Sequence, residues 1–250
     1  FCNELQISKE TTPNLFKNLQ TVLARLGISN GSIEAFVYAS SDINAQCYSS
    51  HDAECIIRFS SSLIEILNEE EFEFVVGHEL GHFLLSHSLK NLQNRNDSIE
   101  FYMQQRAQEI SADRLGLIAC NSLDIAIRAL IKTISGLGDH HLRFDVGSFI
   151  SQLNKISSSR GESHQSTHPS ILVRCRALLW FSLNEAYMDK TRDYEISKLQ
   201  ILDNRIQSDF KKYVDGGIRK QIDEARNTLL MWSKTFEIVQ KGKFSKQEQR

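Results

Sequence analysis

The sequence contains little proline, no long apolar run and no excess of charge of one sign. Pro13 and Pro169 are its two prolines in 250 residues, and because proline breaks the interior of a helix, their scarcity leaves room for long helices. No apolar stretch approaches the roughly 18 residues that span a bilayer, so no transmembrane segment is expected. With 29 Lys and Arg against 31 Asp and Glu, the chain lacks the basic surface that a nucleic-acid partner requires.

The five cysteines give no sign of a disulfide framework. Their number is odd and no two lie in a CxxC spacing, which favours a reducing compartment and predicts a cytoplasmic location. The chain begins at Phe1 without a basic segment followed by an apolar one. A membrane-associated or exported protein whose leader is absent from this chain is therefore the alternative.

What the sequence does contain is strand and helix periodicity in an order typical of an α+β protein. β-branched and aromatic residues predict strands, and apolar residues at spacings of three and four predict helices. The strands are expected at 33–39, 45–48 and 54–59, and the helices at 13–26, 63–67, 69–89, 99–119, 123–135 and 170–187. We therefore expect an α+β, mainly helical fold with a small N-terminal β-sheet.

The C-terminal residues predict a helical extension. Residues 196–250 keep helical spacing with an interruption at Gly216-Gly217, and apolar residues then recur at alternating steps of four and three, as in a heptad. This stripe consists of Ile218, Ile222, Ala225, Leu229, Trp232, Phe236 and Val239. We expect a domain of residues 1–195 and an extension of two amphipathic helices, which packs on that domain, on a second copy or on another partner. A plain amphipathic hairpin within the same core is the alternative.

The segment His78-Glu79-Leu80-Gly81-His82 is an HExxH motif inside a predicted helix. Because residues four apart lie on one face of a helix, both imidazoles are placed to bind one Zn²⁺, and Glu79 is placed to accept a proton from water there. Apolar residues flank the motif, and burying these polar groups without a partner costs several kcal/mol, which a metal ion offsets. His87 follows His82 by five residues, which turns it away from this face, so we expect a helix-end residue.

A third ligand is needed, because a catalytic zinc keeps three protein ligands and one open position. Glu109 and Asp113 lie four residues apart on the next predicted helix. One of them can face the metal while the other accepts a hydrogen bond from a ligand imidazole, and the spacing alone does not decide which. For such a pair in isolation, a solvated helix face is the alternative.

Together these motifs resemble the HtpX-like and CaaX prenyl protease family of gluzincin metallopeptidases. The similar pieces are Asn44-Ala45, ECIIRF with SSLIEIL, EEEFEFVVGHELGHFLLSH, QEISADRLG and STHPSILVRCRAL. They follow one another in the family's order over residues 33–180. Many members are integral membrane proteins, whereas here the stretch between His82 and Glu109 is polar, so a soluble or peripheral member is implied.

The resemblance also implies a set of site residues on a zincin-like core. One zinc ion would be bound by His78, His82 and Glu109, with Glu79 as the base. Asp113 would be the hydrogen-bond partner of a ligand. His168 would lie near the site as a catalytic group that stabilises the tetrahedral intermediate, and Arg174 would support the site.

The strand expected at 54–59 closely precedes the motif helix. As an exposed edge strand, its residues Cys55, Ile56, Ile57 and Arg58 would pair with the backbone of an extended substrate. An ordinary internal strand is the alternative, and the sequence does not separate the two.

We therefore expect a zinc-dependent endopeptidase that hydrolyses extended or unfolded polypeptide segments and binds one zinc ion per chain. The alternative is a zinc-binding but latent or catalytically silent protein that acts through partner binding by its C-terminal helices. The intact Glu79 counts against a silent protein, which has no need of a base. A structural helical protein with an accidental HExxH motif is the second alternative.

Overall fold

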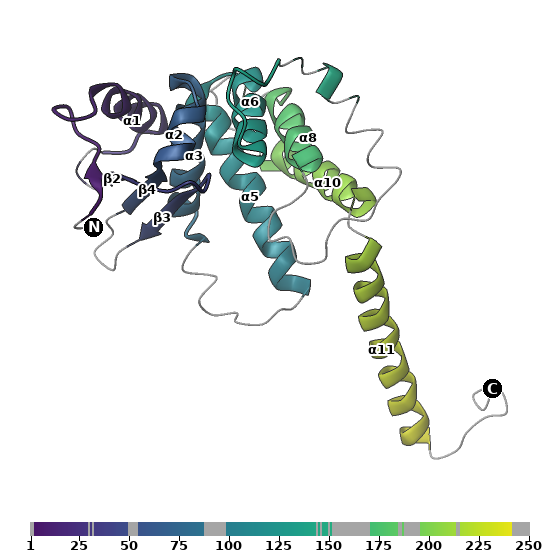
Figure 1. Ribbon diagram of the computed structural model, residues 1–250. Coiled ribbons are helices and arrows are strands. Elements are labelled where there is room, and N and C mark those ends of the chain that lie inside the picture. Colours follow the sequence, from purple (N-terminus) through teal and green to yellow (C-terminus); the bar gives the residue numbers. More distant parts are fainter. Residues whose placement is uncertain are drawn as a thin grey trace.

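The computed structural model describes residues 3–29, 31, 33–49, 55–87, 99–143, 145, 147–149, 151, 171–184, 187, 196–213 and 216–241. Most of this part of the chain is helical, with a small sheet near its N-terminus, which confirms the predicted α+β, mainly helical fold (Figure 1). The helices are α1 (Pro13–Leu26), α2 (Ser61–Ile66), α3 (Glu69–Leu84), α5 (Ile99–Cys120), α6 (Leu123–Ser135), α8 (Ile171–Ser182), α10 (Ile196–Tyr213) and α11 (Gly216–Lys241). None of the helices within the described ranges is long and apolar enough to cross a membrane.

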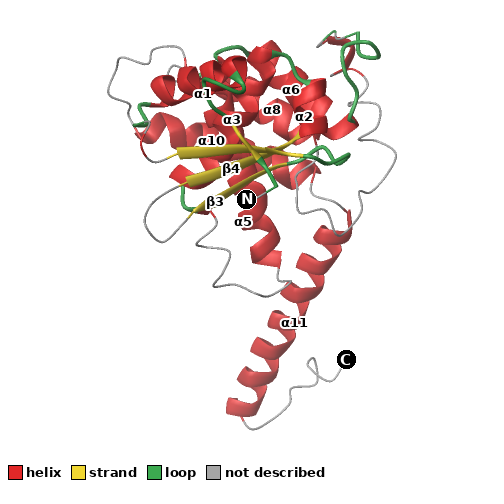
Figure 2. Cartoon of the chain, turned by 60° about the vertical axis from the view of Figure 1, so that its left-hand side comes forward, coloured by secondary structure: helices red, strands yellow, loops and turns green. Residues whose placement is uncertain are grey.

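The described residues form a sheet of four strands in the order β1 (Leu5–Gln6), β2 (Ile33–Tyr38), β4 (Cys55–Ser60) and β3 (Ala45–Ser49). Figure 2 shows β4 and β3 side by side. β4 pairs in parallel with β2 and antiparallel with β3, so both of its sides are hydrogen-bonded. The prediction that Cys55, Ile56, Ile57 and Arg58 form an exposed edge is therefore wrong. A nearly continuous apolar run is typical of a central strand, and the shorter, more polar β3 takes the edge.

The start of α3 is fixed by a capping box. The Glu71 N–H donates to Asn68 Oδ1 at 2.8 Å, and the Asn68 N–H donates to Glu71 Oε2 at 2.9 Å. Glu71 is fully buried, and its charge is met by two cations of α6, Lys132 Nζ at 2.6 Å and Arg128 Nε at 3.2 Å. The first turn of α3 is thus bonded to itself and tied to α6.

The end of α3 differs from the sequence prediction, because the helix stops at Leu84 rather than at residue 89. The Leu85 N–H still donates to the carbonyl of Gly81 at 3.1 Å, and the Ser86 N–H donates to that of Phe83 at 2.9 Å. Ser86 has a φ of 55°, in the left-handed region. A left-handed residue ends a helix, and apolar periodicity gives no signal for it in a serine.

α3 and α5 pack closely because small residues line their contact. A Cβ added to Gly81 would lie 2.9 Å from Ala112 Cα, and one added to Gly116 would lie 2.8 Å from the carbonyl oxygen of Phe74. A Cβ at Gly77 would overlap that of Ala119. The two helices therefore touch backbone to backbone, and α3 lies between α5 and the sheet edge at β3.

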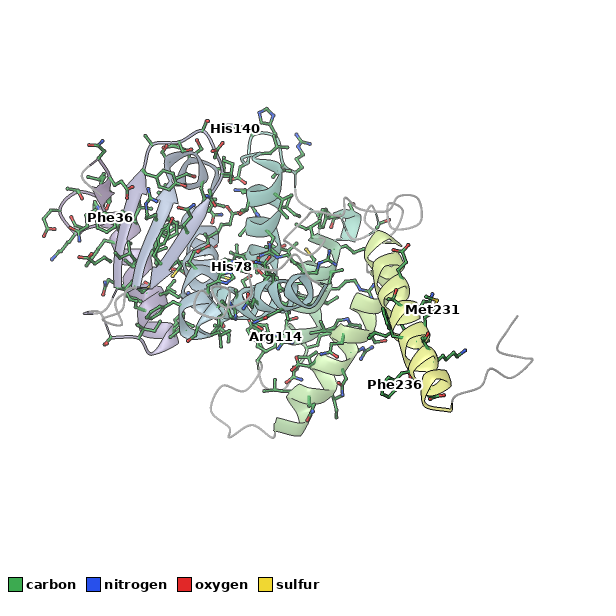
Figure 3. The ribbon with its side chains drawn as sticks, turned by 90° about the horizontal axis from the view of Figure 1, so that it is seen from below. Phe36, His78, Arg114, His140, Met231 and Phe236 are labelled. Carbon is green, nitrogen blue, oxygen red and sulfur yellow. The ribbon has the colours of Figure 1, made fainter. Side chains whose placement is uncertain are left out.

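The two C-terminal helices differ in their surroundings. α10 packs against α8, and its Leu202 and Ile206 belong to the same buried core as the rest of the chain. α11 exposes large apolar side chains, and Figure 3 shows Met231 and Phe236 on its surface, far from His78. The division of the chain at residue 195 stays a prediction, with α10 sharing the main core.

Candidate metal centre

Three potential ligands converge where α3 crosses α5. His78 and His82 lie one turn apart on α3, with their Nε2 atoms 3.1 Å from each other. Glu109 of α5 places one carboxylate oxygen 3.7 Å from His78 Nε2 and the other 3.4 Å from His82 Nε2. Figure 3 shows His78 among the helices, near the middle of the view.

This geometry fits a zinc ion. When a metal binds ligands at about 2.0–2.1 Å with tetrahedral angles, neighbouring ligand atoms lie about 3.3 Å apart. The separations between the ligand atoms, from 3.1 to 3.7 Å, lie on both sides of that value. Two imidazoles and a carboxylate are also the donor set of many catalytic zinc sites.

Asp113 and Arg174 hold the Glu109 side of the centre. Asp113 lies one turn after Glu109, with its Oδ1 3.0 Å from His78 Nδ1. Arg174 of α8 donates to both oxygens of Asp113, from Nη2 at 2.6 Å and from Nε at 2.7 Å, and its Nη1 lies 3.5 Å from Glu109. The structure thus separates the two carboxylates that the spacing left equivalent: Glu109 faces the Nε2 atoms, and Asp113 orients an imidazole from behind.

Burial and charge set the protonation of these groups. Arg174, by its charge and hydrogen bonds, holds the pKa of Asp113 below its usual value, although burial acts in the opposite direction. Burial lowers the pKa of His78, but the hydrogen bond and charge of Asp113 together with Glu109 outweigh it and raise the pKa. Among these residues, Arg174 is the one guanidinium beside several carboxylates, so the centre carries excess negative charge that a divalent cation neutralises.

Glu79 has the environment of a general base. It is almost fully buried on α3 between the two histidines. Burial raises the pKa of its carboxyl above the usual value, while the nearby charges of His78 and His82 act in the opposite direction. A carboxylate whose pKa is moved towards neutrality is matched to accepting and returning a proton near neutral pH.

His87 is a neighbour of the centre that the sequence interpretation missed. Its Nδ1 lies 2.9 Å from Nδ1 of His82, on the side of that ring away from Glu109, and His87 is buried. The sequence interpretation turned it away from the ligand face by assuming that the helix continues through residue 87, whereas α3 ends at Leu84. The left-handed turn at Ser86 brings His87 back to the ring of His82, and nothing in the residue pattern predicts that turn.

The other predicted site residues are distributed unevenly. His168 lies outside the described residues, so its role stays a prediction. Cys55 and Ile57 face the buried side of β4, and Arg58 binds Glu4 through a bidentate ion pair on the other face of the sheet. The structure therefore brings His78, Glu79, His82, Glu109, Asp113 and Arg174 together, and leaves the β4 residues within the sheet.

Comparison with known proteins gives one matching family and two relatives. The model of "Peptidase family M48" matches residues 9–104 and 98–180, well over half of the chain. Metalloprotease YcaL of Escherichia coli (strain K12) is 37% identical over 79 residues, 31% of this chain and 30% of the relative. Metalloprotease LoiP of the same organism is 32% identical over 97 residues, 37% of each chain. The chain thus spans about a third of the length of the curated relatives that it matches, and no solved structure matches it significantly.

Proposed function

Because the chain belongs to peptidase family M48, we propose that it is a zinc-dependent endopeptidase that hydrolyses peptide bonds in extended or unfolded polypeptide segments. The observation that carries the proposal is the convergence of His78, His82 and Glu109 within 4.8 Å of one another, with Glu79 on the same helix. The two relatives are both named metalloproteases, which supports the same chemistry.

Each of the proposed site residues has a role in this mechanism. His78, His82 and Glu109 hold the zinc ion, which when bound polarises a carbonyl oxygen and makes water a better nucleophile. Glu79 accepts a proton from the attacking water and delivers it to the leaving amine. Asp113 keeps the ring of His78 oriented, and Arg174 fixes Asp113 through two hydrogen bonds. His168 is proposed to stabilise the negative charge that develops on the substrate oxygen.

The position of the edge strand β3 is evidence for the proposal that the substrate is extended. β3 hydrogen-bonds to β4 along one side, and among the described strands its other side is the edge of the sheet. β3 also packs against α3. An extended peptide that adds to this edge forms main-chain hydrogen bonds, which depend little on its side chains. We therefore propose broad sequence preference, with β3 in the substrate-binding role that the sequence analysis assigned to residues of β4.

The test compares the wild type with Glu79→Gln. Zinc content is measured after purification without chelator, together with cleavage of a quenched, unstructured protein. We expect about one zinc per chain in both proteins and cleavage by the wild type alone, because glutamine keeps the shape of Glu79 but cannot accept the proton. Absence of zinc in both proteins contradicts the proposal, and equal cleavage by both excludes Glu79 as the base.

One observation favours the alternative in which a partner acts through the C-terminal helices. Leu229, Trp232 and Phe236 of the heptad-like stripe are each more than half exposed on α11. A truncation after residue 213 removes α11 but keeps α10, whose Leu202 and Ile206 complete the core. Cleavage that rises on this truncation indicates a latent enzyme, whereas equal cleavage excludes latency imposed by α11.

A further inference from the structure

We propose that His87 is a positioning residue for the ligand His82. It accepts a hydrogen bond from the Nδ1–H of His82 and so holds the His82 ring with Nε2 directed at the metal position. The proposal rests on the proposed zinc binding by His78, His82 and Glu109. It assigns a function to a residue that the ligand spacing excludes from the site.

The geometry of the two rings carries the proposal. The Nδ1 atoms are 2.9 Å apart, and the rings meet edge to face, with centroids 5.0 Å apart and planes at 72°. Because only one hydrogen lies between two nitrogens, one ring donates and the other accepts. Nε2 of His82 faces His78 and Glu109 and needs its lone pair to bind a metal, so Nδ1 of His82 carries the hydrogen and Nδ1 of His87 accepts it.

The two ligand histidines then have matching support. His78 is held through its Nδ1 by Asp113 at 3.0 Å, and His82 is held through its Nδ1 by His87. A hydrogen bond at the distal nitrogen selects the tautomer of a ligand imidazole and limits its rotation about the χ2 bond. His87 is 6% exposed, so water competes weakly for this bond.

The backbone at Ser86 gives independent support. In a continuing helix, a residue five positions after His82 points about 140° away from it. Instead α3 ends at Leu84, and the left-handed φ of 55° at Ser86 turns the chain so that His87 meets the ring of His82. A left-handed conformation is unfavourable for a residue with a Cβ, and Ser86 is exposed, so no packing of its own side chain explains the turn.

The first test replaces the acceptor while keeping the fold. His87→Leu removes the acceptor and keeps most of the volume, and His87→Asn keeps an oxygen near the position of Nδ1. Zinc affinity of the full chain is measured by competition with a chelator, and the unfolding temperature is measured on the metal-free proteins. We expect His87→Leu to bind zinc about 10–100-fold more weakly, with the asparagine variant within about three-fold of the wild type.

Cobalt provides a readout that a merely structural role does not change. The visible absorption of Co²⁺ reports the geometry of its ligands, so the spectrum of the leucine variant should shift and that of the asparagine variant should match the wild type. Wild-type zinc affinity and an unchanged cobalt spectrum in His87→Leu overturn the proposal. A leucine variant that loses zinc without rescue by asparagine overturns it too, because volume rather than the hydrogen bond then matters.

A second pair of variants addresses the turn without touching any ring. Ser86→Gly permits the left-handed turn and should keep zinc affinity, whereas Ser86→Val disfavours it through its branched Cβ and should weaken zinc binding several-fold. Equal zinc affinity of these two exposed-site variants overturns the role of the turn. A wild type that binds no zinc overturns the proposed function itself, so the failure of the two proposals is distinguishable.

Discussion

The contact between α3 and α5 predicts that a single methyl group at Gly77 weakens both the fold and zinc binding. Gly77 immediately precedes His78, a proposed zinc ligand. A Cβ built there lies well inside 3.0 Å of Ala119 Cβ, and at 3.0 Å from both Gly116 Cα and the Leu115 carbonyl oxygen. Carbon atoms in contact are normally about 3.5–4.0 Å apart, and these neighbours are fixed to the backbone of α5. In Gly77→Ala, the helices must therefore separate by about 1 Å.

Two opposing contributions determine how much Gly77→Ala changes the free energy of unfolding. Overpacking of this kind costs about 1–3 kcal/mol, whereas alanine gains about 1 kcal/mol over glycine inside a helix. We expect a net loss of up to about 2 kcal/mol in the free energy of unfolding, or up to roughly 8 °C in Tm for a chain of this size. Zinc affinity should fall more steeply, because the Glu109 oxygen already lies 3.7 Å from His78 Nε2, and a metal needs about 3.3 Å.

The assay is a double-mutant cycle with Ala119→Gly. Removing the Ala119 methyl removes the worst overlap, so the double variant should recover most of the zinc affinity that Gly77→Ala loses. Unfolding in urea gives the stability and chelator competition gives the zinc affinity. Gly31→Ala is the matched control, because a Cβ there meets nothing within 4 Å. Gly77→Ala as stable as the control, with unchanged zinc affinity, would refute the close packing that we infer.

Further predictions follow from the ion pairs and from the metal. Lys132→Met leaves the buried Glu71 carboxylate with Arg128 as its one cationic partner among the described residues and should lower the free energy of unfolding by about 3 kcal/mol in urea titrations. The pKa of Asp113 is lowered in the folded state, so its contribution is complete above the unfolded value near 3.9 and is lost as pH falls through the folded value. The acid limb of stability of the metal-free protein should therefore flatten in Asp113→Asn, and an unchanged limb contradicts this assignment. Zinc at 100 times its Kd should stabilise the wild type by about 2.7 kcal/mol, and this shift in melting should be absent in Glu109→Gln and after chelation.

Much of this architecture follows from local sequence signals. Periodicity located α1 and α6 to the residue, because each buries an apolar stripe and ends at a left-handed glycine, Gly27 or Gly136, each with a φ of 68°. The placement of the proposed ligands His78 and His82 was equally local, since residues four apart on one helix must share a face. The spacing of the acidic pair on the next helix did not show which carboxylate faces the metal position. Only the crossing of α3 and α5 distinguishes Glu109 from Asp113.

What the sequence did not show depends on contacts between distant segments. The order of strands in a sheet is a property of the tertiary fold, so an apolar strand such as β4 looks the same at an edge or in the centre. The role of His87 depends on one left-handed residue, Ser86, whose side chain gives no preference for that conformation. The sequence analysis predicted a helix extending to residue 89, which would turn His87 away from His82. Because of this error in the helix end, the contact between His87 and His82 was not predicted.

The histidines of the motif and the glycines that contact α5 lie on the same two turns of α3. Gly81 occupies one of the two unspecified positions of HExxH, and a Cβ there would lie 2.9 Å from the Cα of Ala112. Leu80 occupies the other and is fully buried in the core. The same two turns of α3 therefore direct His78 and His82 at Glu109 and press the backbone against α5. The capping box and the ion pair of Glu71 with Lys132 hold the start of the helix. The backbone contact with α5 and these bonds at its start together position α3, and with it the proposed ligand atoms, at separations close to those of a metal site.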